Sequence, residues 1–302
     1  LLSLCGKKEY RYENKNEFNP FIKEYKVLHT KICILKNLFF NLFNLKKPFQ
    51  VAFYENKSFS RILSNIISDH DLVIVHLVRC AEYIKFIKKP CILEMTDAIS
   101  LNYKRISSVD NFSYIKPIIY RLEHCRLIHY EETILKFFRY ALLVSATDIN
   151  YLKDKSEYSS FLLYKNGIDF TKYRFNSKRY NNNKIIYIGN ITSYQNFDSC
   201  LFFIKNIFPS VSRKFNVIFK IIGRINDRDA RYLSTFSNVE VTGEVASISD
   251  EVSDACIGVC PVRMAAGIQN KVLEYMAMGI PCVTSKIGAE GIDAQNDYHF
   301  CV

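Results

Sequence analysis

The sequence lacks a hydrophobic run that could cross a membrane. Its most apolar stretches, such as Leu38–Phe43 and Leu201–Ile204, are interrupted by Asn, Lys or Asp well before the ~20 residues that a membrane-spanning helix requires. The sequence also lacks an internal tandem repeat and a low-complexity tract, which argues against a repeat architecture. Its 49% hydrophobic and 24% charged residues are typical of a globular protein. A chain of 302 residues has room for two domains of roughly 150 residues each.

No CxxC pair occurs among the ten cysteines, which are scattered and lie mostly inside apolar segments. This pattern predicts buried, reduced thiols in a cytoplasmic protein and gives no metal site. The chain begins without an initiator Met or a signal-peptide pattern and stops at YHFCV, in what has the pattern of a strand. We therefore expect a fragment of a longer protein at both ends.

The net charge of +11 is unevenly placed along the chain. Residues 1–165 hold 26 Lys and Arg against 17 Asp and Glu, whereas residues 166–302 hold 15 against 13. Such a bias suits an anionic partner, and peripheral contact with an anionic membrane surface on the inner face of the cell membrane is one candidate. Nucleic acid is not expected, because no basic run is longer than two residues. A solvated lysine-rich surface is the alternative.

Strands and helices alternate from residue 57 onward. A helical pattern over Lys57–Ser68 leads into LVIVHLV, which has the composition of a buried parallel strand, and CILEMTD predicts a second strand. The carboxyl ends of parallel strands meet at one sheet edge, so His76, Arg79, Glu94 and Asp97 are expected to border one cleft. A capping or salt-bridge role is the alternative for each of them.

The alternation predicts two α/β domains with doubly wound parallel sheets. The first is expected over residues 1–168 and the second over 184–302, with a polar linker over 169–183. In the second domain, helix SCLFFIKNIF is expected to open at Asn196-Phe197-Asp198 and to end at Pro209.

The stretch PVRMAAGIQNKVLEYMAMGIPCVTS, residues 261–285, predicts a small-residue loop, a helix that ends at Gly279, and a short strand over 282–284. Lys271 and Glu274 are three residues apart near the start of this helix. Free N–H groups and a lysine suit a phosphate, and a carboxylate one turn later suits sugar hydroxyls. The pattern therefore suggests a nucleotide-sugar site. An ordinary amphipathic helix with a solvated Lys and Glu is the alternative.

Several segments follow one another over residues 70–302 in an order that points to a family: LEMTDAISLNYKR, YEETILKFFRYALLVSATDINYL, NGID, YIGNITSYQNFDS, FKIIGR, VTGEV and PVRMAAGIQNKVLEYMAMGIPCVTSKIGAEGI. This ordered set resembles glycosyltransferases of the GT-B fold, in the large retaining group called family 4. Within that group it is most similar to sugar transferases of bacterial exopolysaccharide and surface-glycan clusters. The resemblance implies two Rossmann-like domains that face a cleft, with the acceptor on the N-terminal side and a nucleotide-sugar donor on the C-terminal side.

The resemblance also implies roles for single residues. Glu274 matches the second glutamate of the family's Glu-x7-Glu signature and is expected to bind the donor ribose. Gly267 and Ile268 match the loop whose backbone faces the diphosphate or the sugar, and Gly189 matches the glycine beside the donor diphosphate. His76 and Asp97 are expected to contact the sugar or the acceptor, as candidate catalytic residues.

The sequence departs from the family pattern at the donor site. Ala266 stands where the first glutamate of the signature belongs, and Asn190 and Gln195 replace the usual Arg and Lys after the strand glycine. Arg263 and Lys271 are then the expected phosphate-binding cations, and Gln269 or Asn270 is expected to take over hydrogen bonds to the sugar.

The predicted function is transfer of a sugar from a nucleotide diphosphate sugar to a glycan or lipid-linked acceptor, with no cofactor and no metal. Two Asp-x-Asp motifs, at residues 69–71 and 227–229, are expected to cap helices. A non-catalytic GT-B-like binding protein and a nucleotide-sugar epimerase of the same fold are the alternatives.

Overall fold

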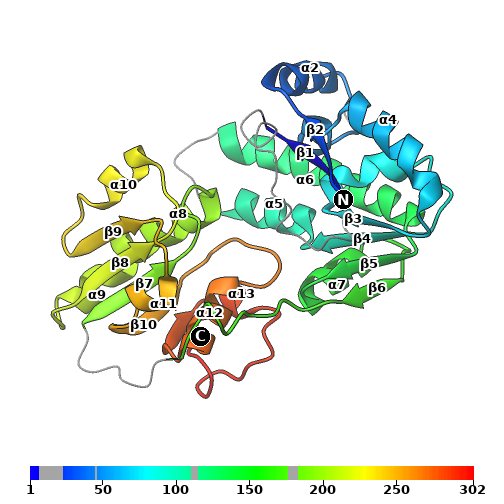
Figure 1. Ribbon diagram of the computed structural model, residues 1–302. Coiled ribbons are helices and arrows are strands. Elements are labelled where there is room, and N and C mark those ends of the chain that lie inside the picture. The colour runs from blue at the N-terminus through cyan, green and yellow to red at the C-terminus, as the bar shows by residue number, and fades with distance from the viewer. Residues whose placement is uncertain (7–22, 45, 110–114, 176–182) are drawn as a thin grey trace. The chain divides into compact units, whose positions relative to one another are not determined.

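The computed structural model describes residues 1–6, 23–44, 46–109, 115–175 and 183–302, which form two compact units (Figure 1). The first unit comprises Leu1–Tyr103, Ile118–Leu143 and Ile149–Leu163, and the second comprises Lys104–Pro117, Val144–Asp148 and Tyr164–Val302. The linker predicted over residues 169–183 belongs to the second unit as far as residue 175. Its residues 176–182 lie outside the described part of the chain.

The first unit contains a four-stranded parallel sheet in the order β3-β4-β5-β6 and a parallel pair, β1-β2. The strands are β1 (Leu2–Cys5), β2 (Tyr25–Leu28), β3 (Val73–His76), β4 (Cys91–Thr96), β5 (Tyr140–Leu143) and β6 (Phe161–Leu163). The prediction of a fully buried strand at LVIV is wrong. β3 lies at the edge of the sheet, and Ile74 is 65% exposed.

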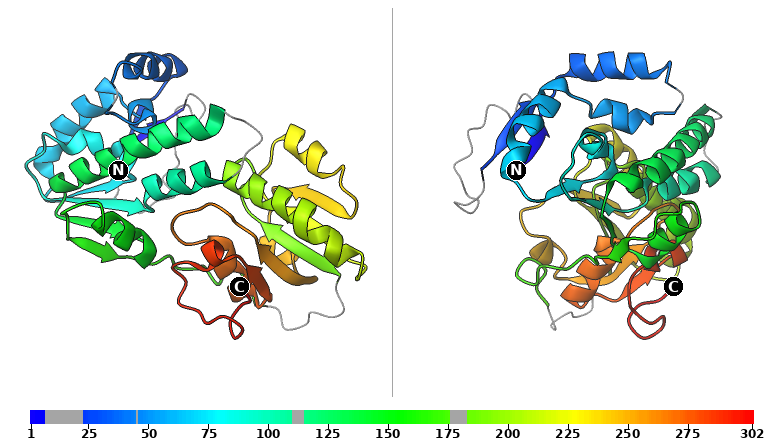
Figure 2. Two further views of the ribbon diagram at one scale, coloured as in Figure 1. Left: turned by 180° about the vertical axis from the view of Figure 1, so that it is seen from behind. Right: turned by 90° about the vertical axis from the view of Figure 1, so that its right-hand side faces the viewer.

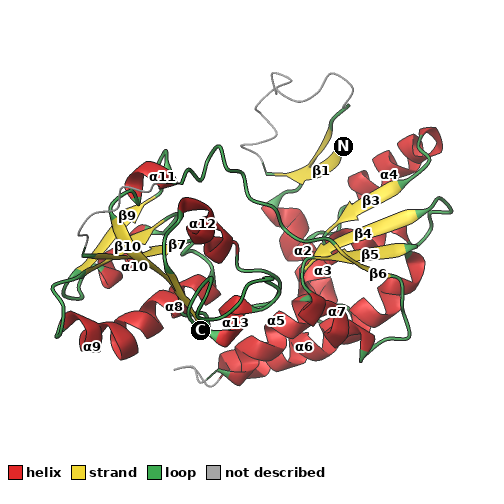
Figure 3. Cartoon of the chain, turned by 90° about the horizontal axis from the view of Figure 1, so that it is seen from below, coloured by secondary structure: helices red, strands yellow, loops and turns green. Residues whose placement is uncertain are grey.

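Helices connect these strands, and Figure 3 shows them in red beside the yellow strands. They are α2 (Lys31–Asn41), α3 (Phe49–Phe53), α4 (Lys57–Ile66), η1 (Ile67–Asp69), η2 (Val78–Ile84), α5 (Ile99–Ser108), α6 (Ile115–Ile134), η3 (Leu135–Phe137) and α7 (Ala146–Lys153). Ser145 caps α7, because its hydroxyl accepts a hydrogen bond of 3.1 Å from the Thr147 N–H.

The second unit contains a five-stranded parallel sheet in the order β11-β10-β7-β8-β9. Its strands are β7 (Lys184–Ile188), β8 (Ile218–Ile222), β9 (Val239–Gly243), β10 (Ala255–Cys260) and β11 (Cys282–Thr284). Its helices are α8 (Tyr194–Phe202), η4 (Phe203–Ile207), α9 (Phe208–Ser212), α10 (Asp227–Leu233), α11 (Ile248–Glu251), α12 (Asn270–Met278) and α13 (Lys286–Ala289). Figure 2 shows this sheet from two further sides.

The helical segment after β7 differs from its prediction at both ends. It begins earlier, because Ser193 is the N-cap and accepts a hydrogen bond from the Asn196 N–H. It also continues past Pro209. One π-helical turn, η4, separates α8 from α9, and Pro209 then occupies the first turn of α9, where a missing N–H leaves no helical hydrogen bond unmade.

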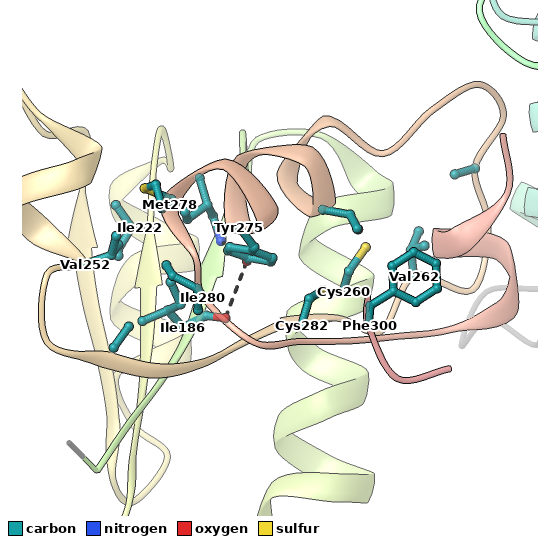
Figure 4. Close-up of a cluster of buried hydrophobic side chains, with 14 residues drawn as sticks. Ile186, Ile222, Val252, Cys260, Val262, Tyr275, Met278, Ile280, Cys282 and Phe300 are labelled. Atoms are coloured by element: carbon teal, nitrogen blue, oxygen red, sulfur yellow. Dashed lines mark hydrogen bonds between the residues drawn. The ribbon is translucent and has the colours of Figure 1, made fainter. Parts of the chain in front are cut away.

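Helix α12 packs on the second sheet through Val272, Tyr275 and Met278, each with no exposed surface. The apolar pattern predicts a face made of Ile268, Val272, Leu273, Met276 and Ala277. Of these, Val272 is buried and Met276 packs, partly buried, against the same cluster. Gly279 ends the helix in the left-handed conformation, with φ of 70°, as predicted. Figure 4 shows Tyr275 and Met278 in the buried cluster with residues of β7, β8, β10 and β11.

Among the described residues, no helix combines the length and the apolar character that crossing a membrane requires. This finding agrees with the interrupted hydrophobic stretches of the sequence.

Candidate functional site

A pocket of about 500 Å³ lies at the carboxyl ends of β7, β8 and β9 in the second unit. Strands β7 and β8 pair in register up to Ile188 and Ile222, so Gly189 and Gly223 follow directly at the rim. The pocket is also bordered by the start of α12. Its lining residues are Ile188, Gly189, Asn190, Asn196, Ile222, Gly223, Arg224, Glu244, Val245, Ile248, Ile268, Gln269, Asn270, Lys271 and Glu274.

Two glycines allow the backbone to turn closely at the pocket rim. Gly223 has a φ of +128°, and a Cβ atom built on it would lie 2.0 Å from the Gly189 carbonyl oxygen. Any side chain at Gly223 would therefore push the ends of β7 and β8 apart. The glycine pair gives the site its open backbone surface, which is the kind of surface that lets a ligand approach main-chain groups.

Lys271 extends from the first turn of α12 into this pocket and is only 7% exposed. Its ammonium group donates to Asn196 Oδ1 at 3.2 Å and to Gln269 Oε1 at 3.3 Å, and it lies 5.3 Å from the centre of the Tyr187 ring. Amide oxygens and an aromatic face orient the charge without neutralising it. The alternative of a solvated surface lysine is therefore wrong, and the site holds a positioned positive charge.

Asn196 holds this part of the pocket together through its side-chain amide. Its position in the sequence predicted only that it opens the helix. Its Oδ1 accepts hydrogen bonds from the Lys271 ammonium and, at 2.7 Å, from the Tyr187 hydroxyl. Its Nδ2 donates to the Asn190 carbonyl oxygen at 3.0 Å. One amide thus connects β7, the loop after it and α12, using both its donor and its acceptor atoms.

Glu274 lies one turn further along α12, where its carboxylate lines the same pocket. The Tyr173 hydroxyl donates a hydrogen bond of 2.9 Å to Glu274 Oε1. Burial raises the pKa of the Glu274 carboxyl group, while the hydrogen bond from Tyr173 and the positive charge of Lys271 act in the opposite direction. Burial also raises the pKa of Tyr173 to about 12, and the Glu274 charge contributes. The Tyr173 phenol is therefore neutral near neutral pH and donates to Glu274.

The pocket brings together seven of the nine predicted donor residues: Gly189, Asn190, Ile268, Gln269, Asn270, Lys271 and Glu274. Asn190 Oδ1 accepts hydrogen bonds from the N–H and the hydroxyl of Thr192, which fixes the loop after β7. Asn270 Oδ1 accepts a hydrogen bond of 2.7 Å from the Asn166 side chain, both residues being in the second unit. The role of these residues in binding a donor stays a prediction.

The other two predicted residues, Arg263 and Gly267, are not among the lining residues. The Arg263 guanidinium makes two hydrogen bonds to the Asp198 carboxylate and lies 4.8 Å from the centre of the Phe202 ring. Its charge is compensated there by Asp198, and the phosphate role of Arg263 stays a prediction. The Gly267 N–H donates to Asp148 Oδ2 at 3.0 Å and is likewise engaged.

Arg224 supplies a lining cation that the sequence analysis did not propose. It is exposed and follows Gly223 directly at the end of β8, and the ion pairs among the described residues do not include it. The signal was present in FKIIGR, since a residue after the last glycine of a strand must lie at the carboxyl edge of a parallel sheet. Glu244 likewise lines the pocket and was not predicted, although it follows the last glycine of β9.

The two candidate catalytic residues, His76 and Asp97, lie at the carboxyl ends of β3 and β4 in the first unit. His76 is paired in register with Glu94, and its Nδ1 contacts Glu94 Oε2. Asp97 follows β4 and donates its N–H to the Met95 carbonyl oxygen at 2.8 Å. Arg79 lies in η2, with Nη1 3.5 Å from the Tyr54 hydroxyl. The predicted sheet edge is thus present, and a catalytic role for His76 or Asp97 stays a prediction.

No group of three or more His, Cys, Asp or Glu side chains able to hold a metal ion is found in the described ranges. At the second Asp-x-Asp motif, Asp227 and Asp229 lie in the first turn of α10, and the Asp229 N–H donates to Asn226 Oδ1. The capping role predicted for this motif is therefore wrong, because the capping side chain is Asn226 and the two carboxylates lie inside the helix.

Comparison with known proteins gives the fold and supports the family. Residues 182–302 match the model of the family described as glycosyl transferases group 1. Similar solved structures include sucrose-phosphate synthase from Thermosynechococcus elongatus, with a TM-score of 0.60, 12% identity, and coverage of 76% of this chain and 60% of that chain. The fold is GT-B.

Two further GT-B neighbours were solved with nucleotides. A TarM variant from S. aureus in a complex that includes UDP has a TM-score of 0.56 and 14% identity, covering 80% of this chain and 48% of that chain. HepE from Anabaena in complex with UDP-glucose has a TM-score of 0.54 and 12% identity, covering 76% and 64%. The chain thus spans about half to two thirds of the length of these structures. No curated protein matches the sequence.

Proposed function

We propose that this chain is a glycosyltransferase that moves a sugar from a nucleotide diphosphate sugar to a glycan or lipid-linked acceptor in cell-surface polysaccharide biosynthesis. The observation that carries the proposal is the pocket at the carboxyl ends of β7 to β9, which combines a buried cation, an exposed cation and a half-buried carboxylate. The group 1 family match over residues 182–302 and the neighbours solved with UDP or UDP-glucose support it.

The donor diphosphate is assigned to the basic end of the pocket. Lys271 supplies a point charge that its amide partners leave uncompensated, and Arg224 supplies a guanidinium that can bind two phosphate oxygens. The first N–H groups of α12, a helix of nine residues, add to the positive potential. Glu274 is assigned to the ribose, because a carboxylate accepts hydrogen bonds from adjacent hydroxyls.

These groups also explain how the reaction is accelerated. In glycosyl transfer the bond between the anomeric carbon and the diphosphate breaks, so positive charge develops on the sugar and negative charge on the leaving group. Lys271 and Arg224 stabilise the leaving diphosphate, and our proposal includes no metal and no cofactor. Retention of the anomeric configuration is part of the proposal, on the basis of the family resemblance.

The acceptor is assigned to the first unit, with His76 and Asp97 as candidate residues for sugar or acceptor contacts. The basic bias of residues 1–165 favours an acceptor that carries phosphate, such as a lipid diphosphate at the inner face of the cell membrane. Asp97→Asn and His76→Ala are expected to lower turnover at saturating donor. Unchanged turnover in both variants would remove them from the reaction.

Product analysis tests the proposal directly. The protein is incubated with labelled UDP- and GDP-sugars and an acceptor extract, and transfer, epimerisation and hydrolysis products are separated. Glu274→Ala is expected to weaken UDP-sugar binding by at least about tenfold in a calorimetric titration, because a charged hydrogen-bond partner is lost. Glu240→Ala is the matched control, since Glu240 is an exposed carboxylate of the same unit outside the pocket.

The outcomes separate the alternatives. Donor binding without a transferred sugar in any extract favours a non-catalytic binding protein, and conversion of one nucleotide-sugar into another favours an epimerase. If Glu274→Ala and Lys271→Ala bind donors as tightly as the unchanged protein, the site assignment itself is wrong.

A further inference from the structure

Helix α2 of the first unit turns polar side chains inward and exposes apolar ones, the opposite of a helix that packs on a hydrophobic core. Its inward positions include Asn37 and Asn41, and Asn41 is only 4% exposed. Asn37 Nδ2 donates to the Glu55 carbonyl oxygen at 2.7 Å, and Asn41 Nδ2 donates to the Lys47 carbonyl oxygen at 3.0 Å. These hydrogen bonds hold α2 by its polar side to the segment around α3.

The opposite side of α2 and the residues just after it expose six large apolar side chains. Ile32 is 80% exposed and Phe43 is 78% exposed, and Phe39 makes edge contacts with both Phe40 and Phe43. We call this set the α2 apolar face. It consists of Ile32, Leu35, Phe39, Phe40, Leu42 and Phe43. Scattered apolar residues are normal on a protein surface, but six large exposed ones within twelve positions are a concentration that calls for an explanation.

Figure 2 shows α2, in dark blue, at the outer margin of the first unit in both views. Helix α2 begins with a side-chain cap, because Thr30 Oγ1 accepts a hydrogen bond from the Cys33 N–H. A capped helix keeps its residues in a fixed arrangement, so the face exists before any partner binds.

The charge along this stretch of the chain is basic. Residues 25–54 contain five lysines and no aspartate or glutamate. Three of these lysines, Lys31, Lys36 and Lys46, are exposed, whereas Lys47 is paired with Glu55. Lys36 also lines a hollow of about 1160 Å³, in which five lysines outnumber the two acidic residues Glu55 and Glu82 and which also includes the 94% exposed Phe86. Aromatic and aliphatic side chains flanked by lysines match the chemistry of an anionic lipid surface, where rings enter the acyl boundary and ammonium groups meet phosphates.

We propose that the α2 apolar face is a membrane-docking surface that binds anionic phospholipid bilayers. The proposal deepens the proposed function, because it names the surface through which the enzyme would reach a lipid-linked acceptor. A second copy of the chain fits this surface less well than a bilayer does, because a symmetric contact would bring the lysines of both copies together in a partly desolvated interface.

Vesicle binding tests the proposal without donor or acceptor. The full chain is sedimented with phosphatidylcholine vesicles and with vesicles that also contain phosphatidylglycerol. The unchanged protein is expected to bind the anionic vesicles and to bind phosphatidylcholine at least about tenfold more weakly. The double variant Phe39→Ser with Phe43→Ser is expected to lose at least about tenfold in vesicle affinity, because two apolar side chains no longer enter the lipid.

Two matched variants isolate the cause. Phe215→Ser removes a 62% exposed phenylalanine from the second unit and is expected to leave vesicle binding unchanged. Lys31→Ala with Lys36→Ala is expected to weaken binding to anionic vesicles by several-fold and to leave binding to phosphatidylcholine unchanged. Equal thermal midpoints for all variants, and equal stabilisation by UDP, show that the fold and the donor pocket are intact.

Several results would overturn the proposal. The proposal is wrong if the unchanged protein fails to bind anionic vesicles. It is also wrong if the phenylalanine double variant binds them as tightly as the unchanged protein. A dimer in light scattering that Phe39→Ser with Phe43→Ser dissociates would assign the face to self-association. Because UDP stabilisation is measured on the same samples, failure of membrane docking and failure of the proposed donor site are told apart.

Discussion

The chain leaves the carboxyl ends of the two parallel sheets through different kinds of residue. In the second unit, the positive-φ residues at these ends are glycines, namely Gly223 with φ of 128° and Gly243 with φ of 81°. In the first unit, they are Leu77 with φ of 68° and Thr96 with φ of 66°. A β-branched residue at positive φ is an outlier that costs about 1–3 kcal/mol.

This difference separates a sheet edge that opens into a pocket from one whose side chains contact one another. Glycines in the second unit clear space along the backbone, and the pocket opens there. In the first unit the strained residues keep side chains at the strand ends, where Thr96 Oγ1 donates to Glu94 Oε1 at 2.8 Å and Glu94 contacts His76. Backbone strain retained beside such a pair is consistent with the candidate role of His76 and Asp97.

The largest expected effect is at the glycine pair of the second unit. Gly223→Ala is expected to lower the free energy of unfolding by about 3 kcal/mol or more, because strain and a backbone clash with Gly189 add together. Gly243→Ala, at a positive φ with open space around it, is expected to cost only about 1–2 kcal/mol. Denaturant unfolding of both variants measures the difference. Equal losses would mean that the close approach of β7 and β8 contributes nothing.

The next effect concerns the positioned cation. Lys271→Ala is expected to weaken UDP binding by about 10- to 100-fold, since a hydrogen bond to a charged group contributes about 1.5–3 kcal/mol. Arg263→Ala, which removes a compensated cation from the same unit, is expected to leave UDP affinity within about threefold. Calorimetric titration of both variants gives the comparison, and a greater loss in Arg263→Ala would return that residue to the donor site.

A third prediction uses the pH dependence of Glu274. Its pKa is raised by burial, so donor affinity is expected to fall as the pH is lowered toward that pKa, above the usual 4.5, where the carboxylate becomes protonated. Stability has the opposite sign, because a raised pKa in the folded state favours folding at low pH and this contribution is lost as the pH rises through it. The measurement is UDP-sugar affinity against pH.

Tyr173→Phe sharpens that measurement. It removes the hydrogen bond that lowers the Glu274 pKa, so the loss of affinity is expected to begin at a higher pH, with a change below about fivefold at neutral pH. Glu274→Gln serves as the control and should abolish the acidic dependence. A pH profile in Tyr173→Phe identical to that of the unchanged protein would contradict the proposed coupling.

The smallest effect is expected in the first unit. Thr96→Ala keeps the strained φ and loses the hydrogen bond to Glu94, whereas Thr96→Gly loses the hydrogen bond and relieves the strain. The Gly variant is therefore expected to be more stable than the Ala variant by about 1 kcal/mol, the reverse of the usual order. Thermal unfolding checks this order, and a more stable Ala variant would show that the strand end is unstrained.

Much of the fold follows from the sequence pattern. The β-branched strands and the glycine after α12 predict parallel sheets, and β11 occupies Cys282–Thr284 as expected. The pattern could not locate the edge of the first sheet, because LVIV has the composition of a central strand, whereas strand order depends on contacts distant in the chain. Pro209 misled for a local reason, since a π-helical turn before it supplies a new helix start.

The site was predicted best where function follows from position on one element. Lys271 and Glu274 lie on one face of α12, so their spacing already indicates a shared pocket. The ion pair of Arg263 could not be predicted, because its partner, Asp198, lies 65 positions earlier in the chain. Tyr173 and Asn196 orient the site through contacts between separate elements, which no spacing rule contains.

The Tyr275 hydroxyl, beneath the pocket, accepts a hydrogen bond from a backbone N–H at the end of β7 that has no partner on the neighbouring strand β10. Pairing of β10 with β7 is in register to Gly258 and Ile186, and the Ile188 N–H two residues later donates to the Tyr275 hydroxyl at 2.9 Å. A Cβ atom on Gly258 would lie 2.7 Å from the Tyr275 ring. Gly258 and Tyr275 are therefore coupled, because a side chain at 258 requires a smaller residue at 275, which in turn leaves a buried N–H beneath the pocket unpaired.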